Sequence, residues 1–238
     1  MAVAVRSSSK VALTTTSPLN LPVPAGTTAG DFMVCVIFAE NLTVAPTASV
    51  TGFTQVGGWV ATAPAGSQPV MGIFTKTAGG SEGTNYSAIG NISTGSYAYV
   101  CMAISGSAGV IEVPLTGSTA TTAATSLVAP TVTPTNAASL LVCGFTQDSG
   151  GAVTYSTPAS MTLVQSFTTA TTEYCRGLVA SQVLTSAAAT GTRTSTSSFN
   201  SLWSAGSFTI APATAGAARL PQPVTNINQA TLNRAAYF

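Results

Sequence analysis

The sequence contains no histidine and few charged residues. Only 5% of its 238 residues are Asp, Glu, Lys or Arg, whereas soluble domains usually carry about 25%. Without histidine, Ser-His-Asp and Cys-His catalytic sites are excluded, and so is the usual general base near neutral pH. The glycine-rich phosphate loops of dinucleotide-binding and ATP-binding proteins are also missing. We therefore expect no enzymatic activity, no catalytic residue and no cofactor.

The chain also lacks a basic cluster and a long hydrophobic run. Its net charge is +1, which argues against an electrostatic surface for nucleic acid. No run approaches the roughly 18 apolar residues of a membrane helix. The opening residues MAVAVRSSSK lack the apolar core of a secretory signal. We expect neither a nucleic-acid partner nor a membrane anchor, and we expect synthesis in the cytoplasm.

The cysteines show no CxxC pair and no zinc-like spacing. They are Cys35, Cys101, Cys143 and Cys175, and each lies inside an apolar or β-type run such as MVCVIF or LVCGF. A reduced cysteine in such a run behaves as a small buried hydrophobe. We expect buried, reduced thiols and no metal site. Disulfides remain open, because four cysteines allow three pairings.

Strand-forming and turn-forming residues are abundant. Runs rich in Val, Ile, Thr, Phe and Tyr recur along the chain, separated by turn sequences such as PAGT, AGGSEG and DSGG. The expected strands lie near residues 10–15, 31–38, 53–62, 70–76, 97–104, 127–133, 140–146, 161–168, 174–184 and 201–210. This pattern predicts an all-β fold, namely an antiparallel β-sandwich of jelly-roll or Greek-key type.

A shift of 108 residues indicates an internal duplication. Without a gap, residues 19–56 fall on residues 127–164 with eight identities, which include a Val-Cys pair in each segment. The two halves would meet near residues 117–125, and they either pack as one sandwich or sit side by side. The expected division is an N-terminal extension (1–9), a sandwich (10–212) with halves 10–117 and 126–212, and an extended C-terminal arm (213–238).

The segment AGDFMVCVIFAEN, residues 29–41, is apolar along its length between Asp31 and Glu40. It predicts a central strand covered on both faces, with Glu40 leading the chain out to solvent. Under the 108-residue shift, Glu40 falls on Asp148. Two acids at equivalent strand ends could hold Ca²⁺ or act as a glycosidase pair. The simplest interpretation is that each is a solvated residue that blunts strand pairing.

Several segments carry a resemblance to a known class of proteins. They are PAGTTAGDFMVCVIFAEN, GFTQVGGWVAT, FTKTAGGSEGTNYS leading into YAYVCMAISG, and ATGTRTSTSSFNSLWSAGSFTIAP. They resemble β-sandwich accessory structural proteins of tailed bacteriophage virions, over residues 9–212. The resemblance implies a capsid decoration (cement) protein, a head fibre or a tail-associated module. A decoration protein is made in the host cytoplasm and sits on the capsid exterior.

The function expected first is decoration of the capsid by a multimer of the chain. A surface of Thr, Ser and Asn can bind a lattice through hydrogen bonds without desolvating charges. Many copies, as trimers on three-fold positions, add up weak contacts. The expected partners are the major capsid protein and further copies of the chain. In the C-terminal arm, the expected capsid-anchoring residues are Arg219, Arg234, Tyr237 and Phe238, unless the arm is a disordered terminus.

The alternative function is that of a tail or head-fibre adhesin, which binds a host surface polysaccharide through exposed aromatic side chains. The candidate residues are Trp59, Tyr86, Tyr97, Tyr99, Tyr155 and Trp203. Aromatic residues in strands are more often core residues, and the chain has no heptad run of the kind that forms a fibre shaft. Decoration of the capsid is therefore the favoured expectation.

Overall fold

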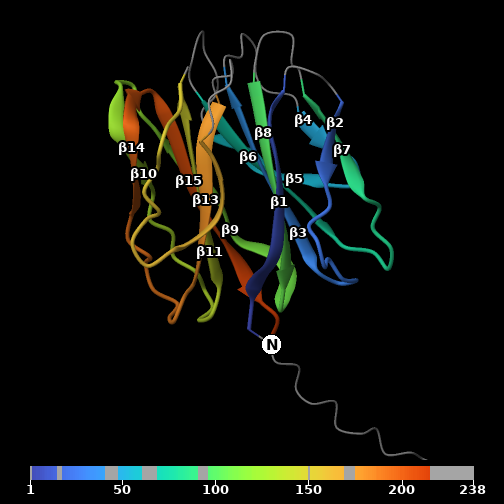
Figure 1. The fold of residues 1–238 in the computed structure, drawn as a ribbon. Helices are drawn as coiled ribbons and strands as arrows, with labels where there is room; N and C mark the ends of the chain where they lie inside the picture. Colours follow the sequence, from blue (N-terminus) through green and yellow to red (C-terminus); the bar gives the residue numbers. More distant parts are fainter. Residues whose placement is uncertain are drawn as a thin grey trace, which may run out of the picture.

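The computed structural model describes residues 2–14, 18–40, 48–60, 69–90, 96–149, 151–168 and 175–214. This part of the chain is all-β, as expected, and contains no helix (Figure 1). The strands are β1 (Ala4–Thr14), β2 (Leu19–Pro22), β3 (Phe32–Glu40), β4 (Ala48–Val50), β5 (Thr54–Val60), β6 (Val70–Thr77), β7 (Asn85–Gly90), β8 (Ser96–Ser105), β9 (Ser107–Thr119), β10 (Ala124–Ala129), β11 (Leu140–Asp148), β12 (Thr162–Phe167), β13 (Cys175–Val183), β14 (Arg193–Ser201) and β15 (Trp203–Pro212).

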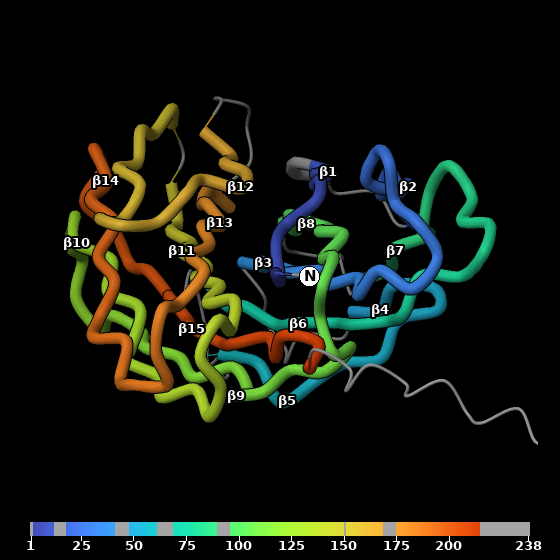
Figure 2. Tube along the Cα trace, turned by 90° about the horizontal axis from the view of Figure 1, so that it is seen from below, coloured from blue at the N-terminus to red at the C-terminus, as the bar shows by residue number. Residues whose placement is uncertain are grey.

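The strands form four antiparallel layers (Figure 2). Two five-stranded sheets, β1-β8-β3-β6-β5 and β12-β13-β11-β15-β9, lie face to face in the middle. A three-stranded sheet, β2-β7-β4, covers the outer face of the first, and β10-β14 covers the outer face of the second. An isolated bridge between Tyr155 and Ser197 extends the β10-β14 layer. The predicted antiparallel β-sandwich is confirmed.

The second half of the chain repeats the topology of the first. The order β1-β8-β3-β6-β5 corresponds strand for strand to β9-β15-β11-β13-β12, and β2-β7 corresponds to β10-β14. Strands β3 and β11 coincide residue for residue under the 108-residue shift. In each repeat the chain crosses between the inner and outer sheets at most steps, while β5 and β6, or β12 and β13, follow each other in the inner sheet, and the resulting pair of sheets is of jelly-roll type. The chain is therefore a tandem pair of jelly rolls.

Strand pairing divides the repeats at Gly106. Strand β9 pairs with β15 of the second repeat and takes the place that β1 holds beside β8 in the first. By this pairing β9 groups with the second repeat, whereas the sequence suggested a division near residues 117–125. The sequence did not indicate this division, because β1 and β9 occupy equivalent edge positions but have dissimilar sequences. The N-terminal extension also differs from the expectation, because β1 begins at Ala4.

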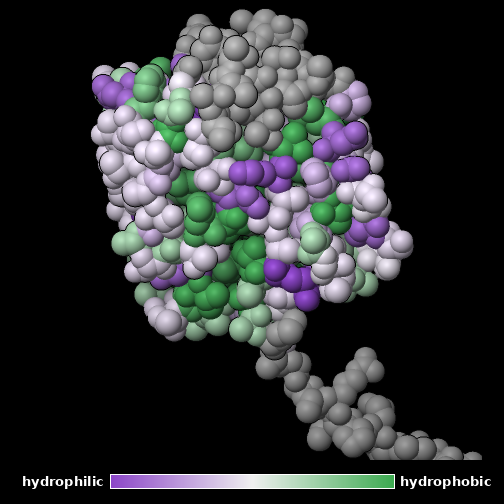
Figure 3. Space-filling view, in the orientation of Figure 1, coloured by the Kyte–Doolittle hydropathy of each residue, from purple (hydrophilic) through white to green (hydrophobic). Residues whose placement is uncertain are grey.

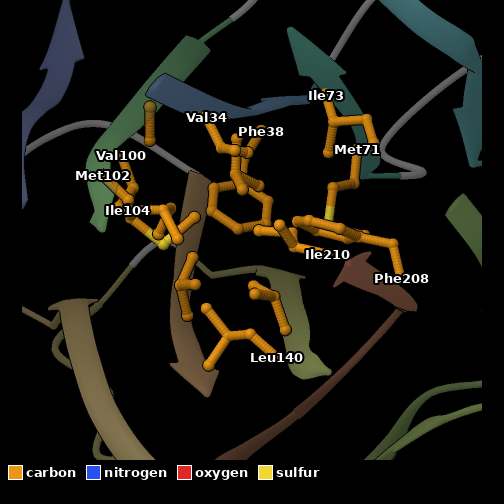
Figure 4. Packing of buried hydrophobic residues seen from close by; sticks show 14 of the residues in the cluster. Val34, Phe38, Met71, Ile73, Val100, Met102, Ile104, Leu140, Phe208 and Ile210 are labelled. Atoms are coloured by element: carbon orange, nitrogen blue, oxygen red, sulfur yellow. The ribbon is translucent and has the colours of Figure 1, made fainter. Parts of the chain in front are cut away.

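The inner sheets of the two repeats share a hydrophobic core, and each repeat has a further core beneath its outer sheet. Side chains from both inner sheets meet between them, including Val34, Phe38 and Met71 from the first repeat and Phe208 from the second (Figure 4). Met71 fills space left by two glycines of the second repeat. A Cβ atom at Gly144 would lie 2.4 Å from its sulfur. Interdigitation of this kind fixes how the repeats sit against each other.

Strand β3 is buried along its entire length, as the sequence predicted for a strand covered on both faces. Alternate residues such as Val34 and Val36 face the shared core. The residues between them, such as Cys35 and Ile37, face the outer sheet β2-β7-β4. Strand β11 repeats this pattern between the shared core and the β10-β14 layer. Because both faces are apolar, neither strand shows the alternation of a half-exposed strand.

Candidate functional site

An acid pair lies where the two central strands end. Glu40 ends β3, Asp148 ends β11, and the two residues are equivalent in the repeats. Their carboxyl groups are hydrogen-bonded to each other. Burial, this hydrogen bond and the negative charge of Asp148 raise the pKa of Glu40 to about 10, although the nearby Arg176 charge opposes the shift. Near neutral pH, Glu40 therefore keeps its proton.

The expectation that Glu40 leads the chain into solvent is wrong. Only 1% of Glu40 is exposed, and Asp148 is half-buried. The Oε2 atom of Glu40 has no hydrogen-bond partner in the described structure. The reason is that face-to-face packing of the repeats brings the ends of β3 and β11 together over the shared core. The shift in the sequence showed that the two acids are equivalent, but not that they meet.

Arg176 is a further ionisable residue near this pair, and it was not among the candidates expected from the sequence. It is fully buried on β13, opposite Gln147 of β11. Its Nη1 atom donates to the backbone carbonyl of Cys175 at 3.4 Å. A charge inside an apolar strand needs compensation from nearby groups. That rule, applied to the run EYCRGL, was the signal that could have identified Arg176.

The geometry of the acid pair fits neither chemistry considered for it. A glycosidase keeps its carboxyl groups at least about 5 Å apart to leave room for the substrate, whereas Glu40 and Asp148 are in hydrogen-bond contact. Calcium takes six to eight oxygen ligands, whereas two carboxyl groups offer at most four. Among the described residues, no group of three or more Cys, Asp or Glu side chains could hold a metal ion. The pair is best described as a polar contact between the repeats.

The other carboxylates of the described chain are also held internally. Asp31 is buried and accepts hydrogen bonds from Arg6 at 3.0 and 3.2 Å. Glu82 forms an ion pair with Lys76 at 2.8 Å. Glu112 is bound by the loop that precedes β11. The described surface therefore presents hydroxyl and amide groups, and its acids are engaged within the fold.

Glu112 acts as an anchor for the loop at residues 135–139. It accepts hydrogen bonds from the backbone N–H of Thr135 at 2.7 Å and from the Ser139 hydroxyl at 2.6 Å. Burial alone would raise the pKa of Glu112, but the hydrogen bonds outweigh it and lower the pKa to about 2. The same loop in the first repeat ends at Asp31, which is bound by Arg6 of β1. The two repeats thus hold the same loop against the same edge strand in different ways: the strand contributes a positive charge, Arg6, in the first repeat and a negative charge, Glu112, in the second.

Most of the aromatic residues considered for carbohydrate binding are core residues. Tyr97 and Tyr99 are fully buried and stack on each other at 6.2 Å under the outer sheet. Tyr86 and Trp203 are also buried, and the remaining candidates, Trp59 and Tyr155, are half-buried. The described surface has one large exposed aromatic side chain, Phe199. These six residues therefore form no exposed aromatic platform.

The cysteines behave as the sequence predicted. All four are buried and free. Cys35 lies directly opposite Cys101 on the neighbouring strand, and burial raises the pKa of both thiols. Such thiols are poor nucleophiles, because the thiolate is the reactive form.

Two cavities lie away from the acid pair. One, of about 320 Å³, runs between β1 and β12. The other, of about 340 Å³, is lined by Arg193, Gln182 and Ser160 among others. The guanidinium of Arg193 donates to the carbonyls of Thr190 and Thr192 and to Gln182, so it pins its own turn.

The expected capsid-anchoring residues, Arg219, Arg234, Tyr237 and Phe238, lie outside the described residues. The chain leaves the described part at Thr214, next to Ala213, whose N–H donates to the carbonyl of Gly106 at 2.7 Å. No helix in the described part is long and apolar enough to cross a membrane. No protein-family model, curated protein or solved structure matches this chain.

Proposed function

We propose that the chain is a structural protein of a bacteriophage virion, a decoration (cement) protein that binds the assembled capsid from outside. The observation that carries the proposal is the tandem jelly roll with one shared core, whose described acids are all held inside the fold. Jelly rolls are common in viral capsid and lectin domains. The resemblance of residues 9–212 to virion accessory proteins supports the same class. Catalysis, a cofactor and nucleic-acid binding form no part of this function.

The surface suits repeated weak contacts with a lattice. Hydroxyl and amide groups exchange hydrogen bonds with water for hydrogen bonds with a partner, at little desolvation cost compared with charges. A single contact of this kind is weak. A homo-oligomer, which we propose is a trimer, binds several equivalent positions at once and gains effective concentration. The partner in this proposal is the major capsid protein.

The end of the fold where the chain leaves is the proposed capsid-facing end. Val3, Gly106 and Ala213 lie at this end, so the chain enters, crosses between repeats and exits there (Figure 1). The acid pair lies at the opposite end of the sandwich. A C-terminal arm that starts here can lie along the capsid. Its basic and aromatic side chains would supply the anchor.

An adhesin remains the second candidate function, but most of the aromatic residues expected to contact a polysaccharide are buried. Four of the six aromatic side chains that would bind a polysaccharide are buried in the core. A carbohydrate site would have to be built from Phe199 and the hydroxyl-rich outer face of β14. The decoration function needs no such site, and we favour it for that reason.

Co-sedimentation tests this proposal. Purified full-length chain is mixed with empty, decoration-free capsids of the phage that encodes it, and in parallel with host cells. A chain that ends at Thr214 keeps every described contact and serves as the comparison. Saturable binding to capsids that weakens on truncation supports the proposal. Binding to cells with none to capsids would contradict it and favour the adhesin.

A further inference from the structure

A groove of about 320 Å³ runs between two edge strands of different repeats. Residues 4–8 of β1 and 162–164 of β12 form its walls, and residues 181–183 and Leu140 complete the lining. We call it the β1–β12 groove. Leu163 and Val183, 46% and 44% exposed, line it. Figure 3 shows hydrophobic surface gathered low on this face of the molecule. The lining is mixed, with about as many polar residues as apolar ones, so an occupant of this groove would need both hydrogen-bonding groups and apolar side chains.

The contact between the opposite edge strands of the two inner sheets, β5 and β9, shows how such a groove can be filled by the protein's own side chains. Strands β5 and β9 meet there as β12 and β1 meet at the groove. Val60 packs so closely on Gly117 that an added Cβ would lie 2.2 Å from it, and Ile111 and Leu115 pack against the core. By strand pairing, the position of Ile111 is taken in β1 by the smaller Val5. The space between β1 and β12 is therefore filled by smaller apolar side chains than the space between β5 and β9.

The strands at the groove have unused edges. Among the described strands, β1 pairs only with β8 and β12 only with β13. The pairing register of each strand shifts beside the groove, between Val5 and Ser7 in β1 and between Leu163 and Gln165 in β12. Irregularities of this kind locally bend a strand and increase its twist. Above the groove, Gln165 Nε2 donates to Ser8 Oγ at 2.9 Å. The carbonyls of Ser8 and Val164 already accept side-chain hydrogen bonds across the groove, so an added strand would pair with other backbone groups of these two edges.

The C-terminal arm contains a segment with the pattern of such a strand. Residues 219–225 read RLPQPVT, with prolines at two alternate positions. Proline fits an edge strand where its missing N–H would face away from the sheet. The intervening residues Leu220, Gln222 and Val224 then direct their N–H groups to the neighbouring strand and their side chains to one face. Two of these three side chains are apolar, which matches the floor of the groove.

The arm starts beside the groove. Ala213 is bound to Gly106, and the neighbouring Ser105 pairs with Ala4 at the end of the groove. Residues 215–219 can span up to about 17 Å when extended. A segment tethered so closely binds at high effective concentration. We propose that residues 219–225 of the chain's own C-terminal arm occupy the β1–β12 groove as an added strand, with Leu220 and Val224 on its floor.

Hydrogen exchange measured by mass spectrometry tests this proposal without any capsid. The full chain is compared with a chain that ends at Thr214. Backbone amides in residues 4–8 and 162–164 exchange about tenfold more slowly in the full chain if the segment is docked nine-tenths of the time. The variant L220D/V224D should exchange like the truncated chain. The matched control, Y237A/F238A, should keep the protection. Equal exchange in the full and truncated chains would overturn the proposal.

Two further readings separate the chain's own arm from other occupants. Leu163→Asp, at an exposed position, should remove the protection of residues 4–8, whereas Val110→Asp, at another exposed position, should keep it. Protection that stays constant while the protein is diluted to monomer supports docking within one chain. Protection that disappears with dilution would overturn it and assign the groove to the arm of a second copy. Neither reading depends on the proposed capsid partner.

Discussion

Glu40 and Asp148 occupy the same position in the two repeats, and their carboxyl groups share a hydrogen bond at the end of the common core. Like charges this close cannot both ionise without a large penalty, so one of the two keeps a proton. Burial makes Glu40 the proton carrier. The contact between the repeats thus depends on protonation, although it contains no histidine.

Glu40→Gln should stabilise the fold by an amount that grows with pH. The folded-state pKa of Glu40 is about 10, far above its ordinary value of 4.5. Its contribution to stability is therefore fully present below pH 4.5 and is lost as the pH rises towards 10. Glutamine carries no such penalty. Urea unfolding at pH 5 and pH 8 should show a widening advantage for the variant, of at most about 1.4 kcal/mol per pH unit. A difference that is constant with pH would contradict this account of the pair.

Glu112→Gln should show the opposite dependence on pH. The lowered pKa of Glu112, about 2, makes its contribution present above its ordinary value of 4.5 and lost as the pH falls towards 2. The variant should lose about 1–2 kcal/mol at pH 7, because several hydrogen bonds to a carboxylate are weakened. Thermal unfolding at pH 7 and pH 3 measures this loss. A loss that is larger at pH 3 than at pH 7 would show that the carboxylate is not what anchors the loop.

Val34→Asp should prevent stable folding. Val34 is fully buried in the shared core, and an aspartate there would be a buried charge without a partner. We expect a loss of more than about 4 kcal/mol. The matched control is Val110→Asp, because Val110 is 52% exposed and should tolerate the change within about 0.5 kcal/mol. Circular dichroism melting curves compare the two variants. Equal melting temperatures would contradict the assignment of β3 as a doubly covered strand.

Gly177→Ala should be strongly destabilising although the change adds a single methyl group. A Cβ at Gly177 would lie 2.2 Å from the backbone oxygen of Phe145, so β11 and β13 would have to separate. The cost should be about 3 kcal/mol. Gly58→Ala is the matched control in strand β5, where an added Cβ meets no atom within 4 Å. Denaturant midpoints of the two variants measure the contrast. A Gly177→Ala midpoint equal to that of Gly58→Ala would disprove the close approach of the two strands.

The parts of the fold that depend on local pattern could be predicted from the sequence. The run of apolar residues around Val34 predicted a doubly covered strand, and the shift that places Glu40 on Asp148 predicted the duplication. Turn residues marked most strand ends. Each of these signals lies within a short stretch of sequence, where periodicity and turn chemistry act directly.

The parts that depend on contacts between the repeats could not be predicted. The burial of Glu40, the placement of Arg176 near it and the pairing of β9 with β15 arise only when the inner sheets pack together. The β1–β12 groove depends on the difference between Val5 and Ile111 at equivalent edges. Such differences have no local signature, because each side chain alone is an ordinary strand residue.

The stability of filled capsids tests the central claim most directly. Capsids that contain DNA but lack decoration are heated with and without a saturating amount of the full-length chain, and DNA release is followed with a fluorescent dye. The account predicts that the release temperature rises as protein is added, and that the rise saturates when the lattice positions are full. A release temperature that stays the same while the protein is present in excess would contradict a decoration function for this chain.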